Sequence, residues 1–459
     1  MKETRPFSMK DKIGYTLGDL GCCCTEQFRA MYLAIFYTLV LKVNPVHVGI
    51  LMLITKLWDA INDPLIGALV DSHQNKGKGK FIPWIKFFAF PTAVLCILGF
   101  VNVSNFAYGA RLAYMFITYV VYEIMYTCVS VPFGSLSSVM TDDVNQRTDL
   151  SRFRSLGGTI FMTVIVIAGP LFLYKDNQPV PSHFLIMAAI CAVIGFICLM
   201  FTSHWCKERI FTEPVAKEKE KLNYLDVLKA ISKNKALLGV MLSSFIGIVG
   251  AGMVNGLNTY LFRDYFGNVA IMAVSGMLSV IWSLIAFIGT KFVAKKFGKK
   301  EWIMYSATFS VVVYAILFFF PLENPMLFII INGICYLGVS GFQVLVWALV
   351  NDAIDYQELQ TGKRNEGIVY SAYTFFRKLA NAVSGSMSSF ALAIAGFQVN
   401  EAVQNEAFSG RLWKTYTGLY VVGYLLAVLV LKFIYPLTKE KTAEMLQDLA
   451  DKRNAATAE

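Results

Sequence analysis

Apolar stretches of about 20 residues recur along the whole chain, and this repetition limits the fold more than any other feature. A helix of that length crosses about 30 Å of hydrocarbon, so each stretch is long enough to span a membrane. The chain of 459 residues is 56% hydrophobic and only 16% charged, with a mean hydropathy of +0.54. Because average soluble proteins are less apolar than this, we expect an all-α membrane protein.

The sequence predicts twelve transmembrane helices with approximate ends. They are expected at 15–41, 45–71, 83–104, 108–140, 151–175, 182–204, 236–262, 269–294, 301–320, 325–352, 366–396 and 409–436. The first is not a cleavable signal sequence, because Asp19, Glu26 and Arg29 interrupt its apolar run. We therefore expect it to remain in the mature protein.

A long polar interruption separates the first six spans from the last six. It contains alternating Lys and Glu at 217–221, followed by apolar residues at the spacing of a short amphipathic helix. The predicted organisation is an N-terminal six-helix bundle, a linker carrying that helix, a C-terminal six-helix bundle and a tail, at 1–204, 205–235, 236–436 and 437–459. Transporters built from two such pseudo-symmetric halves bind their substrate near the bilayer midplane.

The positive charges indicate how the chain is oriented. Most Lys and Arg residues lie in the N-terminal segment, in the loops that follow even-numbered spans and in the tail. The opposite loops contain few of them, namely Lys42, Arg111, Lys175, Arg263, Arg411 and Lys414. Cationic loops resist translocation, so we expect both termini in the cytoplasm and the protein in the cell (plasma) membrane, surrounded by lipid. This distribution explains the net charge of +10 without a nucleic-acid partner.

Cysteine and histidine give no sign of catalysis or of a resident cofactor. The nine cysteines show neither metal-ligand spacing nor a disulfide pattern, and the adjacent Cys22, Cys23 and Cys24 point in three directions on a helix. The four histidines lie at the ends of spans or in a loop and form no catalytic constellation. A multispan enzyme is therefore disfavoured.

Two carboxylates interrupt the second span, where an ionisable side chain costs about 2.5 to 3.5 kcal/mol near the bilayer centre. Asp59 and Asp63 lie one helical turn apart and can converge on one ion, while Pro64 removes a local backbone hydrogen bond. Two like charges this close need a cation or a proton to neutralise them. The pair predicts a site for a coupling cation; the alternative is simple pairing with Lys56 or another cation.

Other polar residues fall within the spans. In the fourth span, Glu123, Tyr126, Thr127 and Ser130 form a stripe of the kind that lines a cavity or packs against another helix. In the first span, Glu26 and Arg29 share a face with Cys23, so Arg29 alone could neutralise Glu26.

Two cations lie near helix ends. Arg154 opens the fifth span and Lys378 lies in the eleventh. Each either reaches a cavity or extends to the cytoplasmic interface, as long basic side chains do.

Several motifs are spread over nearly the whole chain: Trp58 to Pro64 (WDAINDP), Gly79 to Trp84 (GKFIPW), Val131 to Leu136 with Thr141 and Asp142, Arg147 with Leu150 and Arg154, and Asp352 to Tyr356. Together they resemble the melibiose-permease family of glycoside, pentoside and hexuronide cation symporters in the major facilitator superfamily. The resemblance implies two six-helix bundles, the major facilitator fold, and inward sugar transport driven by a sodium, lithium or proton gradient.

The resemblance also implies which residues form the two sites. Those of the cation site are Asp59, Asp63, Thr127 and Ser130, with Asp59 and Asp63 holding sodium or lithium if the ion is not a proton. Those of the sugar site are Cys23, Tyr126, Ser130, Gly134, Arg154, Gln343, Thr374 and Lys378. Four of the matched positions depart from the family's residue types, namely Cys23, Ser130, Gly134 and Gln343.

These departures bear on the substrate. Two acidic groups of the family's site are missing while Arg154 and Lys378 remain, so a uronide is favoured unless Glu26, one turn from Cys23, replaces the lost acid. We expect a monomer that carries a sugar or glycoside with a monovalent cation. The alternatives are the same fold carrying a lipid or other small molecule, an uncoupled facilitator, and a sensor that does not transport.

Overall fold

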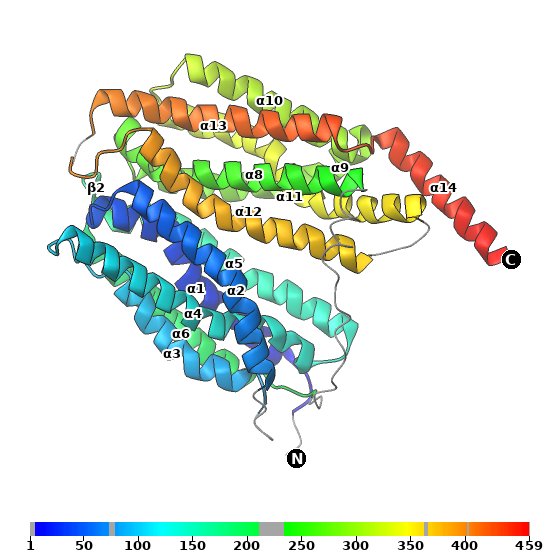
Figure 1. The fold of residues 1–459 in the computed structure, drawn as a ribbon, viewed down its shortest axis with the longest axis horizontal. Coiled ribbons are helices and arrows are strands. Elements are labelled where there is room, and N and C mark those ends of the chain that lie inside the picture. The colour runs from blue at the N-terminus through cyan, green and yellow to red at the C-terminus, as the bar shows by residue number, and fades with distance from the viewer. Residues whose placement is uncertain (1–4, 73–78, 211–233, 362–365, 402–403, 459) are drawn as a thin grey trace. The chain divides into compact units, whose positions relative to one another are not determined.

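The computed structural model describes residues 5–72, 79–210, 234–361, 366–401 and 404–458 (Figure 1). The chain divides into two compact units. The first contains Met1–Ala216, Asn268–Gly276 and Phe397–Val403, and the second contains Lys217–Gly267, Met277–Gly396 and Gln404–Glu459. The short helix expected within 205–235 falls largely on residues outside the described ranges.

The first unit is built from six long helices. They are α1 (Met9–Ile35, continued by a π-helical turn at Phe36–Val40), α2 (Pro45–Ser72), α3 (Ile82–Leu98), α4 (Tyr108–Met140), α5 (Val144–Leu173) and α6 (Pro181–Trp205). A two-stranded antiparallel hairpin, β1 (Tyr174–Lys175) and β2 (Gln178–Pro179), joins α5 to α6. Its turn residues Asp176 and Asn177 have φ of 50° and 63°, a conformation that Asp and Asn tolerate in tight hairpins.

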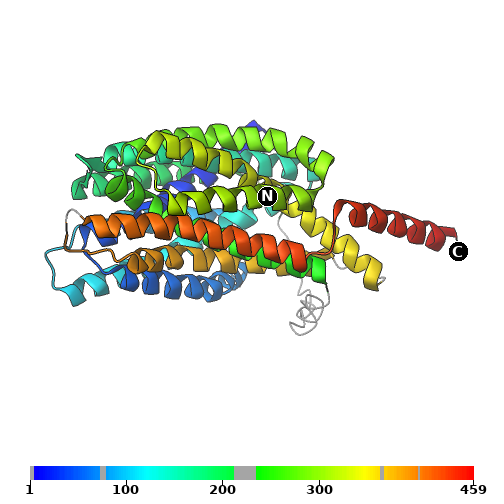
Figure 2. The ribbon, with the colours of Figure 1, turned by 90° about the horizontal axis from the view of Figure 1, so that it is seen from above.

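The second unit contains the later helices. They are α8 (Lys235–Tyr260, continued by a π-helical turn at Leu261–Tyr265), most of α9 (Ile271–Phe297), α10 (Lys299–Phe319), α11 (Pro325–Thr361), α12 (Glu366–Ile394), α13 (Glu406–Phe433) and α14 (Lys439–Ala458). The predicted tail at 437–459 is thus mostly helical, and α14 projects past the ends of the long helices of its unit (Figures 1 and 2).

The predicted fold class is confirmed. By length and apolar content, seven of the described helices can each cross a membrane, and shorter apolar stretches lie at Ile82–Leu98 (α3) and at Pro325–Gly338 within α11. Three other long helices, α1, α2 and α12, carry charged side chains along their length, among them Glu26, Asp59 and Lys378. The protein is therefore an integral multi-pass membrane protein.

Several helices extend beyond their apolar spans, because specific polar contacts satisfy the additional residues. α1 begins at Met9 instead of 15, and Asp11 in its first turn is fully buried against Arg5, 2.7 Å away, and Arg209, 3.0 Å away. α5 begins at Val144 instead of 151, because the Asp143 carboxylate caps it by accepting two backbone N–H bonds. Helix limits predicted from apolar residues alone are too short here.

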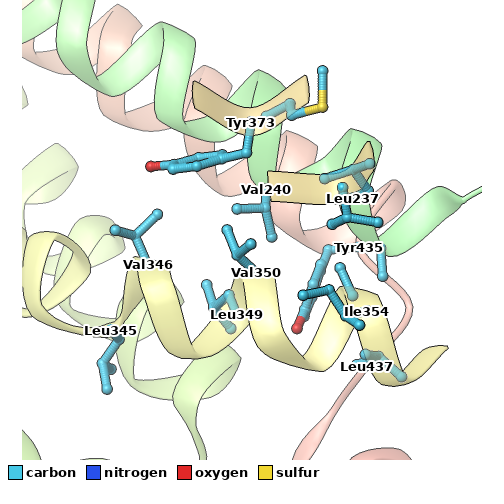
Figure 3. Close-up of a cluster of buried hydrophobic side chains, with 14 of the residues drawn as sticks. Leu237, Val240, Leu345, Val346, Leu349, Val350, Ile354, Tyr373, Tyr435 and Leu437 are labelled. Atoms are coloured by element: carbon cyan, nitrogen blue, oxygen red, sulfur yellow. The ribbon is translucent and has the colours of Figure 1, made fainter. Parts of the chain in front are cut away.

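α11 also runs past its predicted end at 352, to Thr361. Asp352 does not end the helix, because the Lys299 ammonium of α10 lies 2.6 Å from its Oδ1 atom. The apolar side chains of the same helix pack in the core of the second unit (Figure 3). There Val346, Val350 and Ile354 repeat every four residues along one face of α11 and contact the cluster formed with Tyr373 and Tyr435.

The first unit has its own apolar core, in which α1, α3, α4 and α6 meet. Tyr15, Ile85, Phe133 and Leu199 are buried members of one cluster, and the Tyr15 and Phe133 rings lie 4.8 Å apart. α1 also packs against α5, and α2 packs against α4. These contacts place the polar faces of α1, α2 and α4 beside one another.

A buried carboxylate after α6 holds the start of α3. Glu208 is 5% exposed, and its two oxygens accept the backbone N–H groups of Lys80, Phe81 and Ile82 at 2.6, 2.8 and 2.8 Å. These N–H groups lie at a helix N-terminus, where the helix itself provides no acceptor for them. A negative charge at this end is also favoured by the helix dipole. Gly79 precedes them with φ of +81°, in the left-handed region. Glu208 therefore acts as the cap of a helix more than a hundred residues earlier.

Replacing Glu208 with Ala is expected to destabilise the protein by about 3 kcal/mol, because three buried or partly buried backbone donors lose their acceptor. Glu208→Gln retains one acceptor oxygen and should lose less. Thermal unfolding of the purified protein in detergent measures the effect. Glu444→Ala, at an exposed position of α14, is the matched control and should unfold like the wild type. Equal stability of Glu208→Ala and wild type would contradict the capping role.

Candidate functional site

Five charged side chains from α1, α2 and α4 gather inside the first unit. We call this group the charge cluster; its members are Glu26, Arg29, Lys56, Asp59 and Glu123. The Lys56 ammonium lies 3.0 Å from Asp59 Oδ2, 3.7 Å from Glu123 Oε1 and 3.8 Å from Glu26 Oε1. Lys56 thus links carboxylates from three helices, and the pairing of Asp59 with Lys56 that the sequence left open is present.

Arg29 and Glu123 form the deepest part of the charge cluster. Each side chain is 3% exposed, and the Arg29 Nη1 atom lies 3.7 Å from Glu123 Oε1 and 4.0 Å from Glu26 Oε2. The guanidinium carbon lies 3.3 Å from the centre of the Tyr122 ring and 4.7 Å from that of Tyr119, in range for cation–π attraction. Arg29 is therefore held mainly by aromatic faces and by Glu123.

Some atoms of the cluster lack a hydrogen-bond partner. These buried atoms are Glu26 Oε2, Asp59 Oδ1, Glu123 Oε1, and Nε and Nη2 of Arg29. A buried polar atom left unpaired is costly, so native proteins keep such atoms mainly where a proton, an ion or a water completes the set. The charge cluster is therefore a candidate functional site.

One of the predicted cation-site residues, Asp59, belongs to this cluster, and the others lie on α2 and α4 as well. The Thr127 hydroxyl on α4 donates to Asp63 Oδ1 on α2 at 3.2 Å, so the structure brings these two residues together. Asp59 lies one turn before Asp63 on α2, and Ser130 lies three residues after Thr127 on α4, half-buried. Carboxylate and hydroxyl oxygens of this kind are ligands for hard cations, and the carboxylates can also take a proton.

A second charged pair joins α1 to α5. Arg154 Nε donates to Asp19 Oδ1 at 2.9 Å, and the backbone N–H of Gly158 donates to Asp19 Oδ2 at 3.0 Å. Cys23 lies one turn after Asp19, with its sulfur 4.0 Å from Asp19 Oδ2. The close approach depends on glycine, because a Cβ atom at Gly157 would lie 2.7 Å from the backbone nitrogen of Leu20.

Asp19 contacts two of the candidate residues, Cys23 and Arg154, and the sequence reasoning did not select it. Its spacing of four residues from Cys23 was a usable signal, because residues four apart share a helix face. The acid beside Arg154 is therefore Asp19, whereas Glu26, suggested for that role, contacts Lys56 and Arg29. Arg154 is not an unpaired cation, so one of the two charges that favoured an anionic substrate is neutralised.

Tyr126 is half-buried on α4, three residues after Glu123. Its ring stacks on that of Tyr122, with centroids 5.8 Å apart and an angle of 7° between the planes. Tyr122 in turn lies under Arg29. Tyr126 thus joins the aromatic layer that holds the buried guanidinium.

The second unit carries the remaining candidates. Gln343 on α11 and Lys378 on α12 are exposed, and the Thr374 hydroxyl donates to the Tyr370 carbonyl at 2.9 Å. The Trp347 ring stacks on Tyr370 at 5.3 Å, and the Arg377 guanidinium lies 5.6 Å from the Trp347 ring centre. The sequence singled out neither Trp347 nor Arg377, although an aromatic one turn after Gln343 was a signal.

Long apolar helices in two units, with charged side chains buried among them, define a membrane transporter. Residues 14–439 match the family model described as "MFS/sugar transport protein". The chain therefore belongs to this family of the major facilitator superfamily, and it is a transporter, not an enzyme.

Similar proteins span nearly the whole chain. The "Uncharacterized symporter YjmB" of Bacillus subtilis strain 168 is 32% identical over 450 residues, covering 97% of this chain and 96% of that protein. The "Glucuronide carrier protein homolog" of Escherichia coli K12 is 25% identical, with 97% and 96% covered. The crystal structure of a D-xylose-proton symporter superposes with a TM-score of 0.61 at 15% identity, covering 94% of this chain and 98% of that one, and supports the fold.

Proposed function

We propose that this protein is a symporter that takes up a sugar or glycoside together with a monovalent cation by alternating access. The observation that carries the proposal is the pair Asp59 and Asp63, with Thr127 hydrogen-bonded to Asp63, on long helices of a membrane transporter. Charged groups in such helices are costly, and they are kept mainly where they pair with one another or serve ion or substrate passage. The names of YjmB and of the D-xylose-proton symporter support coupled transport.

The proposed cation site consists of Asp59, Asp63, Thr127 and Ser130. Sodium, lithium and a proton are each compatible with carboxylate and hydroxyl oxygens. Ser130 supplies an uncharged oxygen where the resembling family has an acid, so the site carries two carboxylates. The charge of one monovalent cation leaves it net negative, and Lys56 supplies the balancing charge from 3.0 Å.

The proposed sugar-binding residues in the first unit are Cys23, Tyr126, Ser130 and the pair Asp19 and Arg154. A carboxylate accepts from sugar hydroxyls and a guanidinium donates to them, so the pair suits a neutral glycoside. Those in the second unit are Gln343, Thr374 and Lys378. A uronide is the second candidate, supported by the exposed ammonium of Lys378 and by the relative named a glucuronide carrier homolog.

The proposed setting is the cell membrane, with both termini in the cytoplasm, as the distribution of Lys and Arg predicts. The two six-helix bundles at 1–204 and 236–436 would rock around the substrate, and 205–235 would connect them. A monomer is sufficient for this mechanism.

A radiolabelled uptake screen in membrane vesicles tests the function. Neutral glycosides and glucuronides are compared, each with a sodium, lithium or proton gradient and without one. Accumulation that requires a gradient supports symport, whereas equal equilibration in every condition indicates an uncoupled facilitator. Preference for neutral glycosides would exclude the uronide, and failure of every sugar would point to a lipid or another solute.

Replacing Asp19 with Asn is expected to reduce sugar binding at least about tenfold, because it removes the charge opposite Arg154 and weakens acceptance from sugar hydroxyls by about 1.5 kcal/mol or more. The half-saturating sugar concentration of uptake measures the effect. Asp149→Asn, which removes an exposed carboxylate 2.6 Å from Lys12 on the same two helices, is the control. Unchanged sugar affinity in Asp19→Asn would remove Asp19 from the site.

A further inference from the structure

A cavity lies in the second unit where the end of α9, the start of α10, α11 and the start of α14 meet. It has a volume of about 130 Å³, several times the space that one water molecule needs. The described residues that line it include four lysines and one carboxylate, namely Lys295, Lys299, Lys300, Lys439 and Asp352. None of the residues that line the cavity is proposed to bind the sugar or the coupling cation.

The lysines give the cavity an excess of positive charge. The Lys299 ammonium lies 2.6 Å from Asp352 Oδ1, so these two charges compensate each other. The Lys300 and Lys439 ammonium groups instead donate to backbone carbonyl oxygens, at 2.6 and 2.8 Å, which carry no net charge. An ammonium has three donors, so both groups retain further donors. Like charges gathered around one cavity repel one another, and a bound anion removes that repulsion.

Two helix N-termini also meet at the cavity. α10 begins at Lys299 after Gly298, and within the described ranges no side chain caps it. α14 begins at Lys439, and its approach depends on Gly298, since a Cβ atom there would lie 2.9 Å from Lys439 Cβ. Glu301 accepts the Lys439 backbone N–H at 3.1 Å, but the lysines still outnumber the carboxylates. The positive ends of two helix dipoles therefore add to the ammonium charges.

Exposed aromatic rings beside the cavity indicate the level of the membrane surface. Phe297, which precedes Gly298, is 47% exposed, and its ring centre lies 6.5 Å from that of Tyr305, which is 61% exposed. Tyrosine is enriched where the hydrocarbon meets the lipid headgroups. Basic pockets between membrane helices at this level bind anionic headgroups. A lipid phosphate can therefore reach the cavity from the bilayer.

We propose that this cavity binds a phosphate group, carried either by an anionic lipid headgroup or by a free anion. The oxygens of a phosphate point in several directions and can accept from lysines on separate helices, each of which acts as a point charge. Lys295 at the end of α9 and Lys439 at the start of α14 are the exposed members of the set. A bound phosphate joins these two helix ends and neutralises the repulsion between them.

Thermal unfolding of the purified protein in a neutral detergent tests the site. Phosphatidylglycerol replaces phosphatidylcholine in the micelles, and in a separate series sodium phosphate replaces sodium chloride at constant ionic strength. Wild type is expected to be stabilised by at least one of the two probes. Lys295→Gln combined with Lys439→Gln should raise the half-saturating concentration of that probe at least about tenfold, because two charge-assisted contacts are lost.

Lys432→Gln combined with Lys452→Gln is the matched control. It removes two exposed lysines of the same unit that do not line the cavity, and it should respond to the probes like wild type. If the Lys295 and Lys439 double variant fails to fold, Lys295→Gln alone changes one exposed side chain and should weaken binding about threefold.

The two probes distinguish the source of the phosphate. A response to phosphatidylglycerol alone assigns the site to a lipid headgroup, a response to inorganic phosphate alone assigns it to a free anion, and two responses show that the site accepts both. No response of wild type to either probe would overturn the proposal. Unchanged binding in the cavity variants, or equal weakening in the control variant, would also overturn it, because the anion would then bind elsewhere or through overall charge.

Discussion

Replacing Asp59 or Asp63 with Asn is expected to abolish gradient-driven accumulation of the substrate. Each change removes one of two carboxylates that share a helix face, and with it the negative charge that attracts the coupling cation. A lost charged contact of about 3 kcal/mol lowers cation affinity by about 100-fold. Initial uptake rates and final accumulation ratios in vesicles with an imposed gradient measure the loss.

Substrate exchange without a gradient is the control for these variants. Exchange requires the sugar site and the rocking motion but no net ion movement, so it should continue in Asp59→Asn and Asp63→Asn. Thr127→Ala removes a neutral donor that lies 3.2 Å from Asp63 and should have a smaller effect than either carboxylate change. If both Asn variants accumulated substrate like the wild type, the coupling site would have to lie elsewhere.

The sequence was sufficient to predict the parts of the protein that depend on local energetics. A run of apolar residues fixes a membrane helix by its own length, and α4, α6 and α10 fall close to their predicted spans. Asp59 and Asp63 were identifiable for the same reason, since the cost of a charge in hydrocarbon is visible without any partner. Helix ends were less predictable, because caps such as Asp143 and Glu208 decide them.

The features that the sequence could not predict are contacts between residues far apart in the chain. Asp19 meets Arg154 across 135 positions, and Glu208 caps a helix 128 positions earlier. Nothing local to Asp19 indicates that Gly157 lets α5 approach α1 closely enough for that pair to form. The pattern did show that Lys56 could reach Asp59, but not that Glu26 and Glu123 also surround its ammonium.

The buried pair of Arg29 and Glu123 leads to the second large expected effect. Both side chains are 3% exposed, so removing one partner leaves an uncompensated charge where water cannot reach it easily. Glu123→Leu is therefore expected to destabilise the protein by about 3 to 5 kcal/mol, because among the described residues Arg29 then retains Glu26 alone, at 4.0 Å, as a counter-charge. Unfolding in mixed detergent micelles, followed by denaturant titration, measures the loss.

The double variant Arg29→Met with Glu123→Leu separates a buried charge from lost packing. If the cost of Glu123→Leu comes from the unpaired guanidinium, removing that group as well should recover most of the stability. Asp149→Ala breaks a more exposed ion pair with Lys12, 2.6 Å long, and should cost about 1 kcal/mol or less. A double variant as unstable as Glu123→Leu would assign the effect to packing against Tyr119 and Tyr122. A stable double variant that no longer transports would instead show that the pair is kept for function, because the fold can form without it.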